Sequence, residues 1–358
     1  MIALETIRIE DLLRNARARG ASDVHFGGAD QAFMRIDGRL VAVDENPLSE
    51  TTLQAFCEAT MTTGAISRLQ ARGTADGALR TEDGANRVHA FRHESGTRIV
   101  VRLLPASVPT LEDLALPGVL GTLAASGAGL VLFTGPTGSG KTSALAATMN
   151  RINRTSARSI VTVEDPIEFL HRPIRSVVTQ CEIGRDVSDF AEAIRGFMRA
   201  DPDVIAIGEM RDTETMEAAL GAAETGHLVL ATLHTTDAPQ TVDRIVDAFP
   251  GTRQGQVRSQ LAAVLLAVVA LRLVPRATGD GRVCAVEVMT ATDAVRTLVR
   301  EGKTHQLRNT IVTGRNAGMQ TLECHLSDLA VRGLITSEAA RTAANRPADV
   351  QILGEGAN

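Results

Sequence analysis

The chain has 358 residues, enough for about two domains with cores of their own, and a formal net charge of −5. It contains no Trp and no Tyr, and its acidic balance offers no basic groove for a phosphate backbone, so nucleic acid is not the expected partner. The cysteines Cys57, Cys181, Cys284 and Cys324 lie far apart, which excludes a C-x-x-C zinc pair and a dense disulfide framework and indicates reduced thiols.

The first part of the chain reads as a small α+β domain. Residues 1–20 interleave charged and apolar residues at helical spacing without the apolar core of a signal peptide, so they predict a first helix. Strands are expected in ASDVHF, in FMRIDGRLVAV with a turn at Asp37-Gly38, and in NRVHAFRHESGTRIVVRLL with a hairpin turn at Ser95-Gly96. Helical patterning separates the two strand groups at residues 50–69.

Residues 1–104 are assigned to this domain, residues 105–117 to a proline-punctuated linker and residues 118–358 to a second domain. In the second domain the apolar, β-branched runs GLVLFTG, SIVTVEDP, PDVIAIGEM and HLVLATLHT alternate with helical stretches. That alternation is typical of a parallel sheet covered on both faces. From about residue 250 the chain is expected to be mainly helical. The apolar run at residues 261–271 is shorter than the roughly 20 residues that cross a membrane and predicts a buried helix.

A phosphate-binding loop is predicted between the first of these strands and the helix after it. GPTGSGKT fits the pattern G-x-x-x-x-G-K-[ST] in the context of a strand before it and a helix after it. Backbone N–H groups of such a loop turn inward on phosphates, and the helix N-terminus adds positive potential. Lys141 is expected to reach the β- and γ-phosphates of ATP, and Thr142 to ligate Mg²⁺. The predicted nucleotide-binding residues of the loop are Gly135, Pro136, Thr137, Gly138, Ser139, Gly140, Lys141, Thr142 and Ser143.

Acidic residues follow the neighbouring strands. Glu209 comes at the carboxyl end of PDVIAIG, where a second carboxylate would hold Mg²⁺ or its waters. Glu164, Asp165 and Glu168 follow SIVTV, and one of them could orient the attacking water. Three acids beside a polyphosphate would repel it, so turn and capping roles stay open for Glu164 and Asp165.

Two histidines bracket the fourth strand, His227 before it and His234 after it. His234 lies at the carboxyl end of the strand and is the better candidate for sensing phosphate. Satisfying local hydrogen bonds is the alternative role for either.

In this order, the P-loop, TVEDPIEF, DPDVIAIGEMRD and TGHLVLATLHTTDAPQTVDRIVDAFP resemble the Walker A, Asp-box, Walker B and His-box motifs of the secretion-ATPase superfamily. These are the motors of type IV pili and of type II and type IV secretion. Within the superfamily ASDVHF, MRIDGRL, AVRTLVREGKTHQL and GMQTLECHLSDLAVRGLIT resemble segments of the pilus-retraction ATPases. The resemblance implies a PAS-like N-terminal domain and a RecA-like P-loop ATPase domain with a parallel sheet and C-terminal helices.

The resemblance also implies roles for single residues. Glu209 would be the Walker B acid, Glu168 the Asp-box acid that polarises water, and His227 and His234 the His-box pair. Five arginines would be candidates for contacts with phosphate within or between subunits, with ordinary ion pairs as the alternative. They are Arg87, Arg98, Arg102, Arg195 and Arg199.

The resemblance implies a homohexameric, Mg²⁺-dependent ATPase that powers pilus retraction. It would be cytoplasmic and docked at the cytoplasmic face of the inner membrane. Its partners would be further copies of itself, the pilus platform protein and paralogous pilus ATPases, with membrane association only through partners and no nucleic acid. AVRTLVREGK would transmit force or engage the platform, or it would be an ordinary amphipathic helix.

Departures from the retraction pattern leave other readings open. QCEIG places Cys181 where an arginine is usual, Ala270-Leu271 replace a Ser-Gln pair, and GTADGALRTEDGA lacks the expected phenylalanine. These departures leave open a divergent pilus system, or a motor for type IV secretion or conjugative transfer, which is the main alternative function. A nucleic-acid translocase and a catalytically idle regulatory subunit are the others.

Overall fold

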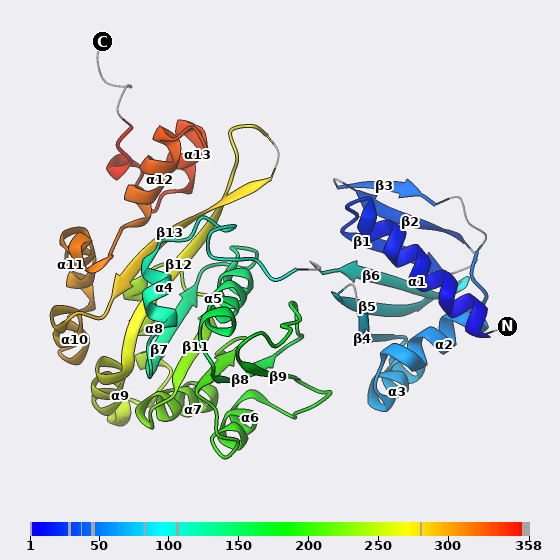
Figure 1. Cartoon of the computed structure of the whole chain (residues 1–358), viewed down its shortest axis with the longest axis horizontal. Helices are drawn as coiled ribbons and strands as arrows, with labels where there is room; N and C mark the ends of the chain where they lie inside the picture. The colour runs from blue at the N-terminus through cyan, green and yellow to red at the C-terminus, as the bar shows by residue number, and fades with distance from the viewer. Residues whose placement is uncertain are drawn as a thin grey trace, which may run out of the picture. The chain divides into compact units, whose positions relative to one another are not determined.

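The computed structural model describes residues 2–27, 30–36, 38–43, 47–81, 84–104, 107–279 and 281–352. The chain divides into two compact units, drawn in Figure 1. Unit 1 comprises Met1–Val108 together with Pro166–Leu170, and unit 2 comprises Pro109–Asp165 and His171–Asn358.

Unit 1 is an antiparallel sheet with helices on one face. In the residues described, the strand order is β3-β2-β1-β6-β5-β4. The strands are β1 (Asp23–Gly27), β2 (Asp30–Ile36), β3 (Arg39–Ala42), β4 (Thr74–Thr81), β5 (Gly84–His93) and β6 (Gly96–Leu103). The helices are α1 (Ile2–Ala18), α2 (Glu50–Thr60) and α3 (Thr63–Arg72).

Strand alternation sorts the side chains of unit 1 between a core face and an open face. Val24, Phe26 and Ile99 are almost fully buried against α1, α2 and α3. Their neighbours His25 and Arg98 are less buried and lie on the other face. That open face also carries charged residues of β1, β5 and β6, among them two of the arginines singled out from the sequence.

Unit 2 is built on a sheet whose order, in the described part of the chain, is β13-β12-β7-β11-β10-β8-β9. All neighbouring pairs are parallel except β12 with β13. The strands are β7 (Gly129–Thr134), β8 (Ser159–Glu164), β9 (Val177–Glu182), β10 (Val204–Ile207), β11 (Leu228–Leu233), β12 (Leu265–Pro275) and β13 (Arg282–Thr290).

The helices of unit 2 cover both faces of this sheet (Figure 1). They are α4 (Val119–Ala124), α5 (Lys141–Thr155), α6 (Phe190–Phe197), α7 (Thr213–Glu224), α8 (Ala238–Asp247), α9 (Gly251–Val264), α10 (Asp293–Arg300), α11 (Leu307–Thr313), α12 (Leu322–Val331) and α13 (Ser337–Ala343). Short 3₁₀ turns η1 (Thr304–Gln306), η2 (Arg315–Ala317) and η3 (Pro347–Asp349) connect or follow the last helices.

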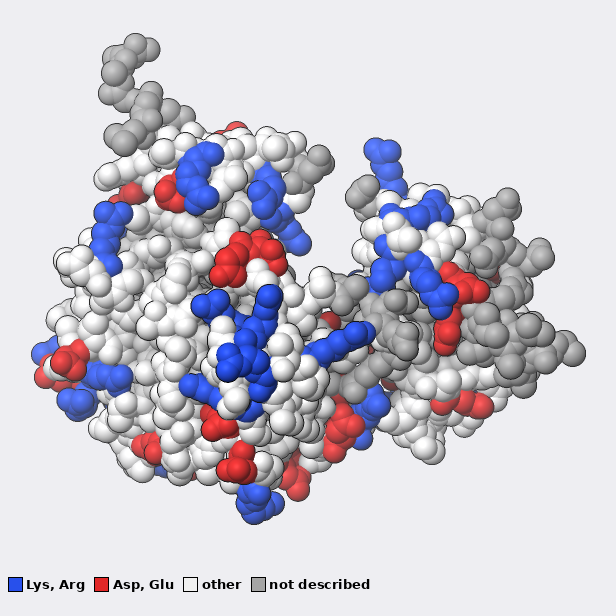
Figure 2. All heavy atoms as spheres, viewed as in Figure 1, with Lys and Arg blue, Asp and Glu red and all other residues white. Residues whose placement is uncertain are grey.

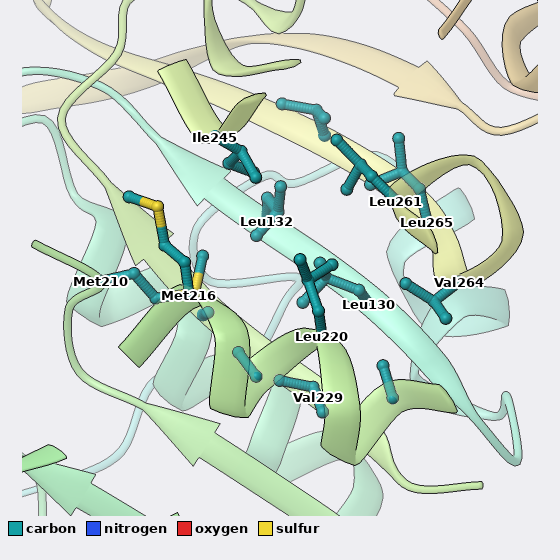
Figure 3. Close-up of a cluster of buried hydrophobic side chains, with 14 of the residues drawn as sticks. Leu130, Leu132, Met210, Met216, Leu220, Val229, Ile245, Leu261, Val264 and Leu265 are labelled. Carbon is teal, nitrogen blue, oxygen red and sulfur yellow. The ribbon is translucent and has the colours of Figure 1, made fainter. Parts of the chain in front are cut away.

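β7 is buried on both sides and joins two cores. Leu130 and Leu132 face α7, α8 and α9, as the close-up in Figure 3 shows for the side chains around Leu220 and Ile245. The alternate residues Val131 and Phe133 pack instead in the core that α4 and α5 cover. Because both faces of β7 are buried, its sequence is a continuous apolar run, and this run predicted the strand.

The sequence interpretation was wrong for residues 261–271. α9 ends at Val264, and Leu265–Pro275 is β12, hydrogen-bonded to β7 on one side and β13 on the other. A short apolar run is compatible with either a buried helix or a buried strand, and here the open edge of β7 decides for the strand. The expectation of a mainly helical chain beyond residue 250 is corrected by the same β12–β13 pair.

Two turns were predicted between strands of unit 1. The hairpin after β5 turns at Glu94-Ser95, one residue earlier than expected, because His93 pairs directly with Gly96. For the turn predicted at Asp37-Gly38, Asp37 lies outside the described residues, although β2 and β3 flank it as a hairpin.

Candidate active site

The predicted phosphate loop turns the chain from β7 into α5. β7 ends at Thr134 and α5 begins at Lys141, so residues 135–140 make the connection. Gly135 has a φ of 142°, and a Cβ there would lie 2.5 Å from the carbonyl oxygen of Leu271. Only glycine fits this position, because both the backbone conformation and the space exclude a side chain.

The N-terminus of α5 differs from those of its neighbours. Its N-cap is Gly140, which supplies no side-chain acceptor. Aspartate side chains cap α6, α7 and α8, from Asp189, Asp212 and Asp237. The first N–H groups of α5 therefore keep the orientation and positive potential that bind an anion.

Polar groups of the loop also suit a phosphate. The hydroxyls of Thr134 and Ser139 are buried and have no hydrogen-bond partner among the described residues. The Lys141 Nζ donates to the carbonyl oxygens of Gly135 at 2.8 Å and Pro136 at 3.0 Å, so its charge lies over the loop. An orphaned hydroxyl, a lysine ammonium and uncapped N–H groups together fit a nucleotide polyphosphate.

Glu209 lies just beyond the carboxyl end of β10 and is held by the side chains of His234 and Arg211. Its Oε1 lies 2.8 Å from the Nε2 of His234 and 2.8 Å from the Nε of Arg211. Its Oε2 accepts a second hydrogen bond from the Arg211 Nη2, also at 2.8 Å. The structure thus brings together Glu209 and His234, which the sequence had placed after different strands.

The environment of Glu209 favours its ionised form. Burial raises the pKa of this carboxyl, but the Arg211 hydrogen bond and the charges of His234 and Arg211 outweigh burial and bring the pKa below its ordinary value. The hydrogen bond from Arg211 in turn raises the pKa of that guanidinium. Glu209 is therefore a carboxylate near neutral pH, as a ligand of Mg²⁺ or of its waters has to be.

Backbone contacts fix the strand ends around Glu209. The N–H of Gly208 donates to the carbonyl of Val163 at the end of β8. The Thr232 hydroxyl on β11 donates to the carbonyl of Gly208 at 2.6 Å. The charge of Asp165 acts on Arg211. The carboxyl ends of β8, β10 and β11 thus form one rim, and the phosphate loop follows β7 at the same edge of the parallel sheet.

Glu164 is used within the sheet. It is buried, and its Oε1 accepts from the Thr162 hydroxyl at 2.7 Å and from the Gln180 Nε2 at 3.1 Å. These bonds favour a structural role for Glu164, one of the alternatives the sequence left open.

Glu168 belongs to the short segment that groups with unit 1, and it forms an ion pair there with Arg87. The other two N-terminal arginines also pair with acids on the open face of the sheet. Arg98 binds Asp30 at 2.8 Å, and Arg102 binds Asp23 at 2.9 Å.

The remaining candidates lie elsewhere in unit 2. Arg199 donates to the carbonyl of Arg195 on α6, and the charge of Arg195 acts on Asp189 and Glu217. His227 precedes β11, and its Nδ1 lies 2.9 Å from the carbonyl of Ala222. That is the opposite end of the strand from His234, about 20 Å away at the usual rise per residue.

The helix in AVRTLVREGK is amphipathic. Val295 and Val299 of α10 are fully buried. Arg296 donates to the carbonyls of Ala262 and Ala263 at the end of α9, so the helix is pinned to unit 2 along one face.

Arg211 is the site residue that sequence reasoning missed. It stands two positions after Glu209, and side chains two apart in an extended segment point the same way. An arginine at that spacing from the acid was a usable signal.

Comparison with known proteins identifies the family. The family described as "Type II/IV secretion system protein" matches residues 3–353. The "Type IV pilus retractation ATPase PilT" of Pseudomonas aeruginosa is 41% identical over 340 residues, covering 95% of this chain and 98% of that protein. A "Twitching motility protein" of Neisseria gonorrhoeae is 48% identical over 255 residues, covering 71% of this chain and 68% of that protein.

A solved structure agrees with these matches. The structure described as the pilus retraction motor PilT with bound ADP has a TM-score of 0.86 and 38% identity, and covers 95% of this chain and 97% of that one. The chain therefore belongs to the type II/IV secretion system protein family. It is a P-loop ATPase with the two-part α/β fold that the sequence predicted.

Proposed function

We propose that this chain is the ATPase subunit of a motor that retracts type IV pili. The observation that carries the proposal is the 41% identity with a pilus-retraction ATPase over nearly the full length of both chains. A P-loop and a carboxylate held at the same sheet edge supply the chemistry that such a motor needs.

In this proposal the rim residues of unit 2 divide the work. Lys141 and the first N–H groups of α5 would bind the β- and γ-phosphates, and Thr142 would be a ligand of Mg²⁺. Glu209 would hold the metal or its waters, while His234 and Arg211 fix the direction of the carboxylate. Mg²⁺, when bound, would neutralise charge on the phosphates.

The larger assembly is also part of the proposal. Subunits would form a homohexameric ring in which Arg87, Arg98 or Arg102 of one copy, or Arg195 and Arg199, contact phosphate, and Glu168 polarises the attacking water. Residues 1–104 and 118–358 would be its domains, with 105–117 as linker. The ring would work in the cytoplasm, docked to an inner-membrane platform protein. In the described residues no helix has both the length and the apolar character to span a membrane.

The test is a count of surface pili by electron microscopy in a strain that lacks the gene. The strain is complemented with wild type or with Lys141→Ala, which removes the ammonium at the phosphate loop. Excess pili and lost twitching, corrected only by wild type, are expected. Unchanged pili and motility in the deletion strain would contradict a role in retraction.

A secretion or conjugation motor is the second candidate, because the matched family includes type II and type IV secretion proteins. It predicts unchanged pili together with defective DNA transfer or protein export in the same deletion strain, so one set of strains separates the two functions.

A further inference from the structure

Two exposed segments of unit 2 are fixed side by side at the end of α5 that lies away from the phosphate loop. One is the last turn and a half of α5, and the other is the stretch before β9. Asn153, which is 1% exposed, joins them. Its Nδ2 donates to the carbonyl of Arg172 at 2.8 Å, and its Oδ1 accepts from the N–H of Ile174 at 3.0 Å.

Further hydrogen bonds continue this junction. The N–H of Arg175 donates to the carbonyl of Asn153 at 2.9 Å. The Ser176 hydroxyl donates to the carbonyl of Ser156 at 2.7 Å, and the N–H of Val177 donates to the carbonyl of Arg158. The backbone of residues 172–177 is thereby held rigidly against residues 153–158.

The junction displays basic and apolar side chains together. We call this surface the arginine patch; it consists of Arg151, Arg154, Arg172, Ile174, Arg175 and Val177. Its arginines are exposed, and Ile174 and Val177 are 61% and 66% exposed. Figure 2 shows Lys and Arg side chains gathered over α5 on the face of unit 2 that it draws. The nearby acid Asp113 has a lowered pKa, first because of hydrogen bonds with Thr110 and then because of the charge of Arg154.

The arginine patch lies away from the nucleotide rim. α5 begins at the phosphate loop and is 15 residues long, which corresponds to about 22 Å. Val177 begins β9 and pairs with Ser159, the first residue of β8. The arginine patch is thus at the amino ends of the parallel strands, whereas Glu209 and His234 are at their carboxyl ends.

We propose that the arginine patch binds the anionic phospholipid headgroups of a membrane surface directly. Guanidinium groups bind phosphate oxygens through paired hydrogen bonds, and clustered basic residues are attracted to an anionic leaflet. The exposed side chains of Ile174 and Val177 beside them would enter the boundary between headgroups and acyl chains. An acidic protein partner would bind the arginines but would not require these apolar side chains. Because Asn153 already fixes the backbone, binding orders little more than the side chains.

This inference is independent of the retraction function, and it differs from the sequence-based expectation that membrane association occurs only through partners. The experiment is flotation of the purified full chain with vesicles of phosphatidylcholine, alone or with about 30 mol % phosphatidylglycerol. Wild type is expected to float with the anionic vesicles only, and to be released as salt rises.

The triple variant Arg151→Gln, Arg154→Gln, Arg175→Gln should bind the anionic vesicles at least about tenfold more weakly. The matched control Arg276→Gln, Arg282→Gln, Arg332→Gln removes three exposed arginines from another part of unit 2 and should bind like wild type. Ile174→Ser with Val177→Ser should weaken binding without changing its salt dependence.

The proposal would be overturned if wild type did not bind anionic vesicles, or if the triple variant and its control lost vesicle binding equally. It would also be overturned if the oligomeric state changed in the triple variant alone. This last result would mean that the arginine patch is an interface between copies of this chain. ATP hydrolysis by the triple variant should equal that of wild type. If the wild-type protein did not hydrolyse ATP, the proposed function would be contradicted, but the conclusion on membrane binding would not be affected.

Discussion

Two of the glutamate–arginine pairs described in unit 2 are each joined by two hydrogen bonds but have very different surroundings. Glu209 and Arg211 are joined by two hydrogen bonds of 2.8 Å, and Glu217 and Arg253 by bonds of 2.7 and 3.4 Å. In both pairs the arginine holds the pKa of the glutamate below its usual value, against the effect of burial. The Glu209 side chain is 18% exposed and the Glu217 side chain 54%.

The difference between the pairs is their location. Glu209 also contacts His234 and stands at the sheet edge where the phosphate loop begins. Glu217 lies on the surface between α7 and α9, where Arg253 also stacks over the ring of Phe249. The ion pair alone therefore does not distinguish a candidate site residue from a surface residue. The position of Glu209 at the carboxyl edge of the parallel sheet does.

Glu209→Gln should have the largest effect, because it keeps the shape of the side chain and removes the charge that we propose would hold Mg²⁺. ATP hydrolysis should fall by about 100- to 1,000-fold. Steady-state phosphate release measures it, with Glu217→Gln as the matched control, expected within about twofold of wild type. Similar rates for the two variants would mean that Glu209 has no catalytic role.

The second test concerns a buried histidine, because protonating its imidazole would place a charge away from water. Burial lowers the pKa of His171 from 6.5 to about 4. Above pH 6.5 the imidazole is neutral in both states; as pH falls toward 4 only the unfolded chain takes up the proton, so stability is lost across that window. The full loss is about 3 kcal/mol.

Urea unfolding of unit 2 at about pH 7 and about pH 4.5 measures this loss. His171→Gln should remove much of the acid dependence, whereas the exposed His305→Gln should leave it intact. Equal acid dependence in all three proteins would show that His171 is protonated in the folded state.

Arg211→Gln should have an intermediate effect. The Glu209 carboxylate would keep only the His234 contact and lose its fixed direction, so kcat should fall about tenfold. The pKa of Glu209 should rise without the guanidinium, which moves the acid limb of the pH–rate profile to higher pH. A lower rate with an unmoved acid limb would contradict this account of Arg211.

Arg253→Gln should have the smallest effect. The pair with Glu217 is exposed to solvent, so its loss should leave both the free energy of unfolding and the rate of hydrolysis almost unchanged. Thermal unfolding and ATPase assays check both values. A large loss of activity would indicate that this surface touches another subunit.

The sequence predicted the parts of the fold that are determined by short stretches of sequence. The strands around the phosphate loop are apolar runs with both faces buried, and Gly135 and Lys141 occur in a pattern whose chemistry is fixed by spacing. β12 could not be separated from a helix, because the deciding factor is the neighbouring edge of β7. β4 and β9 were missed for a similar reason, since each is an edge strand with exposed positions that lack a clear apolar alternation.

Side-chain partnerships were less accessible to sequence reasoning than strands. That Glu209 meets His234 follows from the order of β10 and β11 in the sheet, which the sequence does not contain. The ion pair of Arg87 with Glu168 joins residues 81 positions apart, in a segment that groups with unit 1 although it lies within the sequence of unit 2. Such long-range contacts depend on tertiary packing rather than on local pattern.

The place of β12 between β7 and β13 has a mechanical consequence. Helices α10 to α13 follow β13, which is paired with β12 from Ala267 to Pro275, and β12 is paired with the strand that carries the phosphate loop. A pull on those helices along the strands would load two rows of backbone hydrogen bonds in shear, where many bonds must break at once. We expect this connection to be stiff, so that displacement at the C-terminal helices reaches the nucleotide loop almost undiminished, and the amide hydrogens of β12 to exchange among the slowest in the chain.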